Sequence, residues 1–414
     1  MKNTLKLLSI SFIFTAVVLV AEGEIPLKAG AGLAVWTMPQ IVAKAEVVAK
    51  VEDWKLSKTL PEHKSIIRIC YSPDGKKMIT SNRWNPEIII RNANTLEKLA
   101  EISIPLWLQE TGKPNIERVE FNKDGTKIVG FADHGLMLVW DAVSFQLIAM
   151  TKADTGLFWT PSFNPDKTKL ITGSHFDSKE CLIRDGESFK HLGIISSNSK
   201  NSFICRAEFS ADGSLIATIK DLGNEIEIWS TNSYEKIGSI QSDSAVNKAA
   251  KFSPDGSKII VLNSQTLSVW DAQTFQQLAA FPTLDKVNGF YEVLFSPDGA
   301  KLIASDSGKV RIWDTKSLEQ IKELNHAYHF SISQDSKKLV TANYQGDNVS
   351  IWDTTTFNKI AQFDAANKTN KDEHVTSVHF SQDSKKVFIA SYWNAPLQIW
   401  EPQANQSDIP LRVK

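Results

Sequence analysis

The chain has 414 residues, 42% of them hydrophobic and 22% charged, and its 46 basic and 47 acidic side chains leave a formal net charge of -1. This composition is that of a globular protein and excludes a disordered or collagen-like chain. A sequence pI of about 6.7 excludes the strongly basic surface that binds nucleic acid or anionic lipid. We therefore expect no nucleic-acid partner.

The N-terminus carries a targeting pattern. Lys2 and Lys6 precede an apolar run over residues 7–21, which is shorter than the roughly 20 residues of a membrane-spanning helix. A second apolar run follows over residues 29–38, and we expect cleavage after Ala45. An uncleaved anchor made of both runs is the alternative, and it would be the only membrane contact. The mature protein is therefore expected outside the cytoplasm, periplasmic or secreted; a cytosolic protein without a targeting segment is a third interpretation.

The chain has three cysteines, Cys70, Cys181 and Cys205. They lie in or beside short apolar runs, which favours small buried side chains and allows at most one disulfide bridge. Packing must therefore hold the fold together.

A five-residue phrase recurs eight times along the chain. The copies are YSPDG from Tyr71, FNKDG from Phe121, FNPDK from Phe163, FSADG from Phe209, FSPDG from Phe252, FSPDG from Phe295, ISQDS from Ile332 and FSQDS from Phe380. The mean spacing of about 44 residues is the period of a four-stranded propeller blade.

Each phrase lies between two short apolar runs, which predicts a β-hairpin. Its aspartate is expected to bond the turn backbone, while Gly or a small residue adopts the left-handed conformation that follows. One carboxylate per turn is too few for a calcium loop. The eight aspartates are Asp74, Asp124, Asp166, Asp212, Asp255, Asp298, Asp335 and Asp383.

A third apolar run ends in Trp in six of the eight repeats, and an acidic residue follows in five of them, as in Trp313-Asp314. Arg91 and Arg184 replace the tryptophan in the first and third repeats. We expect these tryptophans to pack between blades rather than to bind a cofactor. The repeated tryptophans are Trp140, Trp229, Trp270, Trp313, Trp352 and Trp400.

A fourth strand follows each of these pairs except the last, after Trp400. Residues 54–60, before the first repeat, have the missing strand's pattern, so we predict that they complete the last blade and close the ring. The predicted fold is an all-β, eight-bladed propeller of four-stranded antiparallel blades. Its predicted parts are a signal peptide or membrane-targeting segment (1–45), a linker (46–51), the propeller (52–402) and a C-terminal tail (403–414).

These phrases resemble the repeats of the WD-repeat family, whose blades carry a Ser-Pro-Asp-Gly hairpin and end in Trp-Asp. The resemblance covers roughly residues 52–402, but the family's Gly-His dipeptide is mostly missing, and only His63 and His374 lie near its place. The resemblance implies a rigid, non-catalytic scaffold that binds other proteins through loops and side chains at the channel mouth. We expect a monomer without cofactors.

Motifs for a catalytic serine, a zinc protease, a phosphate-binding loop or a CxxC pair are missing from the sequence. The Asp-x-x-Thr-Gly-x-x-x-Trp repeat of periplasmic quinone enzymes does not occur either. The alternative function is an extracytoplasmic propeller enzyme, a hydrolase or lactonase, with a metal at the channel mouth. His326 and His374, at equivalent positions of adjacent repeats, would hold that metal with Asp372 and Glu373; two loop histidines without a metal are the competing interpretation.

Large aromatic side chains in loops and at strand starts are the candidates for binding a partner, because they bury much area at low entropy cost. Packing between blades is the other interpretation, and it is favoured for Trp159. The candidates are Trp107 in the long connection over residues 103–115, Trp84 and Trp393 at matched places in the first and eighth repeats, and Tyr291 and Tyr328 four residues before a hairpin phrase.

Overall fold

The structure is a computed structural model. It describes residues 52–60, 66–82, 87–105, 116–132, 136–152, 162–173, 180–197, 204–220, 223–243, 247–284, 289–365, 374–391 and 395–403. The targeting segment, the linker up to residue 51 and all but the first residue of the C-terminal tail lie outside these ranges. His63 lies outside them as well.

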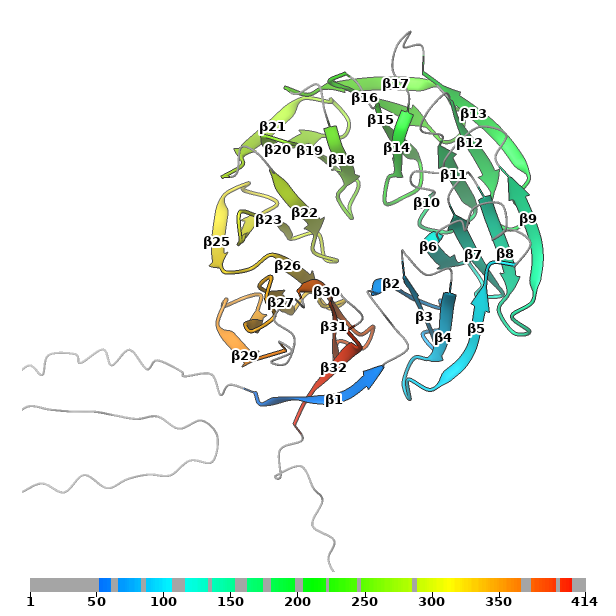
Figure 1. Ribbon diagram of the computed structural model, residues 1–414. Coiled ribbons are helices and arrows are strands. Elements are labelled where there is room, and N and C mark those ends of the chain that lie inside the picture. Colours follow the sequence, from blue (N-terminus) through cyan, green and yellow to red (C-terminus); the bar gives the residue numbers. More distant parts are fainter. Residues whose placement is uncertain are drawn as a thin grey trace, which may run out of the picture. The chain divides into compact units, whose positions relative to one another are not determined.

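The described residues form eight four-stranded antiparallel sheets, the blades of a closed ring (Figure 1). We number the blades in the order of the hairpin phrases. Their strands are, from blade 1 to blade 8, β2 (Ile66–Tyr71), β3 (Lys77–Asn82), β4 (Glu87–Asn92), β5 (Lys98–Ser103); β6 (Ile116–Phe121), β7 (Lys127–Ala132), β8 (Leu136–Asp141), β9 (Leu147–Lys152); β10 (Ser162–Phe163), β11 (Lys169–Gly173), β12 (Glu180–Asp185), β13 (His191–Ser196); β14 (Ile204–Phe209), β15 (Leu215–Lys220), β16 (Glu225–Ser230), β17 (Lys236–Gln241); β18 (Asn247–Phe252), β19 (Lys258–Asn263), β20 (Thr266–Asp271), β21 (Gln277–Pro282); β22 (Phe290–Phe295), β23 (Lys301–Asp306), β24 (Lys309–Asp314), β25 (Gln320–Asn325); β26 (His329–Ile332), β27 (Lys338–Ala342), β28 (Val349–Asp353), β29 (Lys359–Phe363); and β30 (Val375–Phe380), β31 (Val387–Ser391), β32 (Leu397–Pro402) with β1 (Trp54–Leu60).

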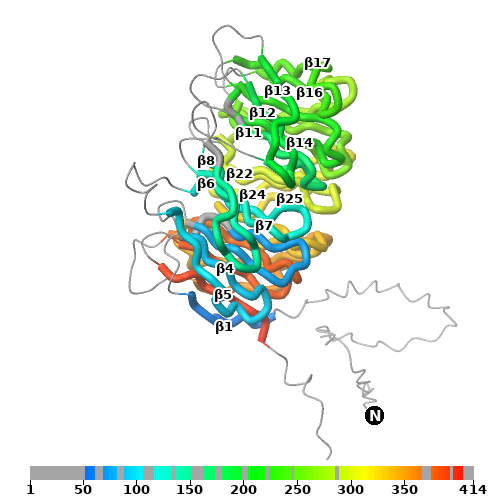
Figure 2. The backbone as a smooth tube through the Cα atoms, turned by 90° about the vertical axis from the view of Figure 1, so that its right-hand side faces the viewer, coloured from blue at the N-terminus to red at the C-terminus, as the bar shows by residue number. Residues whose placement is uncertain are grey.

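The first strand of each blade lies nearest the ring axis and the fourth lies at the rim, as Figure 1 shows for β22 and β25. Figure 2 shows the same ring from the side. The predicted eight-bladed all-β fold is confirmed. Within the ranges that the structure describes, no helix has the length and apolar character to cross a membrane.

The hairpin phrase forms the predicted turn. In blade 4 the Ser210 hydroxyl and the Ser214 N–H donate to Asp212 Oδ1 over 2.5 and 3.0 Å, and Gly213 adopts a φ of +72°. These two bonds hold the pKa of the Asp212 carboxyl below its usual value. The expectation of a small residue at the left-handed position is wrong in blade 3, where Lys167 has a φ of +55°. Its ammonium donates to the Phe121 carbonyl of blade 2, which ties the turn to the neighbouring blade.

The repeated tryptophan and aspartate have separate structural roles. Trp313 is 1% exposed within the wall between blades, as predicted. The Asp314 carboxylate accepts the backbone N–H groups of the next turn, from Lys316 and Ser317, over 2.9 and 2.7 Å. Arg91, which replaces the tryptophan in blade 1, is 3% exposed and donates to the Leu96 carbonyl. In blade 6 the pair therefore fixes packing and a turn.

Neighbouring blades meet along a seam built from one small and one large side chain. A Cβ on Gly238 of β17 would lie 2.1 Å from Cε2 of Phe275, in the turn between β20 and β21 of the next blade. Gly193 faces Tyr234 of the next blade in the same way. This small position lies on the fourth strand, opposite the third-strand residue that precedes the repeated Trp or Arg. In six blades the strand register places a small residue there: Ala100, Ala149, Gly193, Gly238, Ala279 and Ala361. In blades 6 and 8 the same position is a lysine, Lys322 and Lys58 respectively.

The ring closes as predicted. Strand β1 pairs antiparallel with β32, from Trp54 opposite Pro402 to Leu60 opposite Leu397. The Gln403 N–H also donates to the Asp53 carbonyl over 2.7 Å. The two ends of the propeller thus share one sheet.

Cys181 fits the expectation of a buried side chain, whereas Cys70 does so only in part. Cys181 is fully buried in the wall between blades 3 and 4, and Cys70 is half-buried on the inner strand of blade 1. The side chain of Cys205 lies outside the described part.

Candidate interaction surface

One face of the ring collects the loops that precede the inner strands and the loops that join the second and third strands. The two kinds of loop are bonded to each other. In blade 6 the Ala327 N–H, after β25, donates to the Gly308 carbonyl in the β23–β24 turn over 2.9 Å. In blade 7 the Ala365 N–H donates to the Gly346 carbonyl over 2.9 Å. Side chains on this face are therefore carried by a braced backbone.

Four aromatic side chains on this face form a continuous row, which we call the aromatic ladder: Tyr291, Tyr328, Tyr344 and His374. Successive ring centroids are 6.3, 6.1 and 4.2 Å apart. The first two contacts are tilted by 52° and 56°, and the imidazole of His374 stacks on Tyr344 at 22°. Such offset and tilted pairs are the arrangements that aromatic rings prefer.

The ladder spans three blades. Tyr291 is the second residue of β22 in blade 6, Tyr328 precedes β26 and Tyr344 follows β27 in blade 7, and His374 precedes β30 in blade 8. The three tyrosines are 51%, 37% and 40% exposed, in chain order. The exposed part of the ladder, three tyrosines on blades 6 and 7, is thus available to a partner, and the half-buried His374 extends the row to blade 8.

Glycine makes room for the centre of the ladder. Gly308 has a φ of +75°, and a Cβ there would lie 3.0 Å from Cε2 of Tyr328. The Tyr328 ring therefore lies directly on the β23–β24 turn of blade 6, which fixes its orientation. The backbone N–H of Tyr328 donates to the Ala342 carbonyl at the end of β27.

The loop that carries Tyr344 is held on both sides. Asn343 Oδ1 accepts the Gly346 N–H over 2.9 Å, which closes the turn. The Val375 N–H of blade 8 donates to the Tyr344 carbonyl over 2.9 Å. Tyr344 and His374 therefore sit on segments that are bonded to each other, which explains why their rings are parallel and close.

The structure brings together two of the predicted partner-binding residues, Tyr291 and Tyr328. The candidates Trp84, Trp107 and Trp393, and also Trp159, lie outside the described residues. Tyr344 was missed by the sequence analysis because it occupies no repeated position. The only signal for it was the longer connection between the second and third strands of its blade, residues 343–348.

The two histidines of the metal hypothesis have different neighbours. His326 is exposed, has a φ of +56° and lies beside β25, whereas His374 stacks on Tyr344. The other two proposed ligands, Asp372 and Glu373, lie outside the described residues. Among the residues that are described, no three His, Cys, Asp or Glu side chains are grouped as metal ligands.

The central channel holds a cavity of about 340 Å³ beside the inner strands of blades 2, 4 and 5. Its basic side chains are engaged by the ring itself. Arg118 pairs with Glu120, Arg206 donates to the Lys248 carbonyl, and Lys251 donates to the Val293 carbonyl of the next blade. Arg206 and Lys251 therefore join adjacent inner strands, whereas Arg118 is paired within its own strand.

Burial in the channel also changes the acidity of its carboxyl groups. The loss of water raises the pKa of the Glu208 carboxyl, although Lys251 lies near enough to oppose the change. The same cause raises the pKa of the Glu292 carboxyl to about 7, against the opposing charge of Lys251 and the Phe330 N–H.

Comparison with known proteins agrees with this fold. The family model described as "WD domain, G-beta repeat" matches residues 284–314, which lead from the start of blade 6 to its Trp313-Asp314 pair. Eukaryotic translation initiation factor 3 subunit I of Xenopus tropicalis is 25% identical over 119 residues, which are 29% of this chain and 35% of that protein. The matched part thus spans about a third of that relative. The crystal structure of the C-terminal WD40 domain of Sif2 matches with a TM-score of 0.67 and 15% identity, over 86% of this chain and 99% of that domain. At that identity the likeness shows the fold alone. In its repeated hairpins, its Trp-Asp pairs and its fold the chain is therefore similar to the WD-repeat β-propellers.

Proposed function

We propose that this propeller is a monomeric, non-catalytic scaffold that binds a partner protein through the aromatic ladder. The observation that carries the proposal is the contact between three exposed tyrosine rings on a face whose loops are hydrogen-bonded to one another. Tyrosine is enriched in the energetically dominant positions of protein interfaces, because it buries a large area with few rotatable bonds to immobilise.

The rigidity of the ladder supports this function. Gly308 and the backbone bonds at Tyr328 and Tyr344 orient the rings before any partner arrives. A surface that is ordered in advance loses less conformational entropy on binding than a flexible loop does. Each phenol also offers a hydroxyl for hydrogen bonds at the rim of an interface.

The relatives fit a binding role. The name of the Xenopus protein describes it as a subunit of a translation initiation factor, that is, as part of an assembly. WD-repeat propellers in general present loops on a rigid ring, so that function depends on the residues that the loops carry. In this chain the described loops carry the ladder.

A random-peptide display selection on the full chain tests the proposal. The test variant replaces Tyr291, Tyr328 and Tyr344 by Ala. The control variant replaces three apolar side chains of the outer strands, Ile148, Ile237 and Leu278, which are 52%, 50% and 46% exposed.

We expect the selected peptides to bind wild-type protein and control equally, and to lose about tenfold or more in affinity for the ladder variant, which corresponds to about 1.4 kcal/mol. Equal affinities for the ladder variant and the control would refute the proposal.

We propose also that the propeller acts outside the cytoplasm, because Lys2 and Lys6 precede an apolar run in the pattern of a targeting segment. Cell fractionation of the full chain with intact-mass measurement is the test. A protein that begins at Glu46 in the periplasm or the medium is the expected result, and retention of residues 1–45 in the membrane fraction would indicate the anchor. A full-length protein in the cytosol would contradict export.

A further inference from the structure

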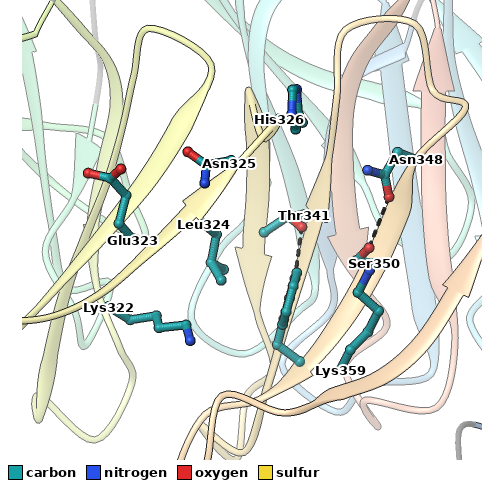
Figure 3. Close-up of a pocket in the computed structure, with 10 residues that line it drawn as sticks. Lys322, Glu323, Leu324, Asn325, His326, Thr341, Asn348, Ser350 and Lys359 are labelled. Atoms are coloured by element: carbon teal, nitrogen blue, oxygen red, sulfur yellow. Dashed lines mark hydrogen bonds between the residues drawn. The ribbon is translucent and has the colours of Figure 1, made fainter.

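A groove lies between blades 6 and 7, apart from the channel and beside the ladder. It encloses about 330 Å³ between β25 on one side and β27, β28 and β29 on the other. In Figure 3 His326, Asn325 and Asn348 lie at one end, and Lys322 and Lys359 lie toward the other end on opposite walls. A volume of this size admits a few amino-acid side chains.

The groove lies at one of the two seams that have a lysine at the small position, the other being that of Lys58 in blade 8. Six other blades have Ala or Gly at the seam position that Lys322 occupies, and there the next blade inserts its turn residue. The turn residue of the next blade, Phe357, still packs against the core of blades 6 and 7, and Lys322 lines the groove outside that core. Trp352 is half-buried in the groove wall, while the other five repeated tryptophans are at most 9% exposed.

The groove has an excess of positive charge. Lys322 Nζ forms no hydrogen bond or ion pair with the part of the chain that the structure describes. Lys359 Nζ lies 5.2 Å from the Trp352 ring centroid and donates to the neutral Gln362 side chain. The acid in the wall, Glu323, is neutralised by Lys309 over 2.6 Å. Two ammonium groups on opposite walls therefore lack an anionic partner.

Neutral polar groups line the rest of the groove and have fixed orientations. The Ser350 hydroxyl donates to Asn348 Oδ1 over 3.1 Å. This bond fixes the side-chain amide of Asn348, whose nitrogen is a hydrogen-bond donor. The Trp352 indole N–H donates to Thr341 Oγ1 over 2.9 Å. Such amide and hydroxyl groups suit the polar backbone of a peptide.

We infer that this groove binds a short acidic peptide segment, with a side-chain carboxylate held between Lys322 and Lys359. Carboxylate is the anion that proteins present most often, and the paired ammonium groups supply the complementary charge. His326 at the end of the groove is two residues from Tyr328, so a partner bound on the ladder can extend directly into the groove. The inference goes beyond the proposed function, because the groove has its own charged residues and binds without the ladder.

Fluorescence anisotropy with the full chain tests this site. The probe is a labelled octapeptide with three consecutive glutamates flanked by glycine and serine, and the matched peptide has glutamines instead. We expect the glutamate peptide to bind more tightly than the glutamine peptide by about tenfold in about 0.15 M salt. Lys322→Ala, which introduces the kind of small residue found in six other blades, and Lys359→Gln should each remove most of that difference.

The controls separate this site from general charge and from the ladder. Lys316→Ala removes an exposed lysine of the same blade, and Tyr328→Ala alters the ladder; both should leave the glutamate peptide bound. Equal losses in Lys316→Ala and Lys322→Ala, equal binding of the two peptides, or no binding at about 1 mM protein would overturn the inference. Displacement of the peptide by inorganic phosphate at equal concentration would indicate a small-anion site and would also overturn it.

Discussion

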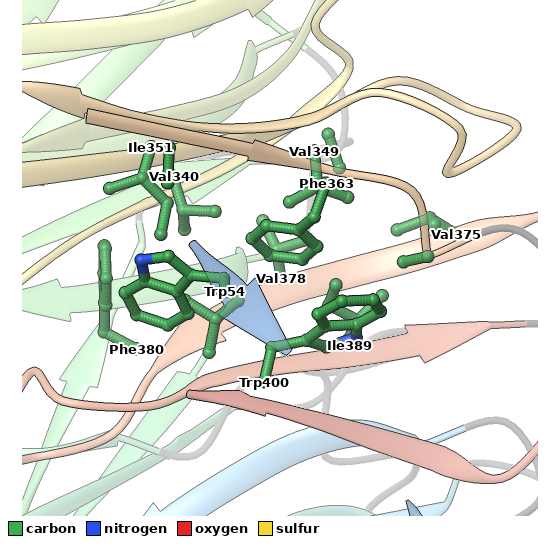
Figure 4. Close-up of a cluster of buried hydrophobic side chains, with 14 residues drawn as sticks. Trp54, Val340, Val349, Ile351, Phe363, Val375, Val378, Phe380, Ile389 and Trp400 are labelled. Carbon is green, nitrogen blue, oxygen red and sulfur yellow. The ribbon is translucent and has the colours of Figure 1, made fainter. Parts of the chain in front are cut away.

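Replacing Trp54 by Ala should destabilise the whole propeller, because this side chain packs into the core where the first strand, β1, pairs with the last strand, β32. Trp54 is 7% exposed and stacks on Phe363 of blade 7 with ring centroids 6.0 Å apart. Phe363 in turn stacks on Trp400 of blade 8 at 4.3 Å. Figure 4 shows the three rings among aliphatic side chains such as Val340 and Ile351. Truncation of a buried tryptophan to alanine costs about 3–5 kcal/mol in the free energy of unfolding.

Urea unfolding followed by circular dichroism measures this loss. With a slope of about 2–3 kcal/mol per molar urea, Trp54→Ala should lower the midpoint by about 1–2 M. Leu56→Ala is the matched control, because Leu56 lies on the same strand but is 45% exposed, and its midpoint should stay close to that of the wild-type protein.

Equal midpoints for the two variants would refute the reasoning that burial in the joint stabilises the ring. Deletion of residues 54–60 is the stronger perturbation, since it leaves the edge of β32 unpaired and uncovers Phe363. That variant should associate at high concentration through the open edge. A monomeric deletion variant with an unchanged thermal midpoint would contradict closure by β1.

Two further predictions follow from the channel and the ladder. The pKa of the Glu292 carboxyl is raised from 4.5 to about 7. The free energy of unfolding therefore falls as the pH rises through this interval, by about 1.4 kcal/mol for each pH unit and by at most about 3 kcal/mol in total. Thermal melts at about pH 4 and about pH 8 should therefore show that the stability of Glu292→Gln, relative to that of the wild-type protein, is greater at the higher pH. An equal difference between the two proteins at both pH values would contradict the assignment. Gly308→Ala places a side chain at a φ of +75° and 3.0 Å from Tyr328, so it should cost about 1–2 kcal/mol in stability and also weaken ladder binding. Gly256→Ala, at a φ of +71° with open space around it, should lose stability but keep its ladder binding. Loss of ladder binding in both variants would show that Gly308→Ala does not weaken binding through Tyr328.

The fold could be predicted because its signals repeat. Each hairpin phrase combines a turn with two buried strands, and eight copies fix the blade number even where Lys167 or Arg91 breaks the pattern. Closure by β1 followed from counting fourth strands. These features depend on local hydrogen bonds and alternating burial, which a single sequence displays directly.

The candidate sites depend on differences between blades, which a repeat analysis averages out. Tyr291 and Tyr328 were found because they share a repeated position, whereas Tyr344 lies in a loop of unequal length. Lys322 is conspicuous only when aligned with the small residues of six other blades. That alignment requires the register of the fourth strand, which the sequence periodicity does not reveal. The fourth strand is largely exposed, and its pairing is irregular next to each repeated Trp or Arg.

The joint between β1 and β32 also has a consequence for biosynthesis. The Ser57 hydroxyl donates to the Ile399 carbonyl across 342 positions of sequence, so the strand made first acquires its partner only when almost the entire chain has left the ribosome. Until then blade 8 is incomplete and the ring cannot gain the cooperativity of a closed circle. A nascent or prematurely terminated chain therefore presents an unpaired strand at each end, and unpaired strand edges are prone to aggregate.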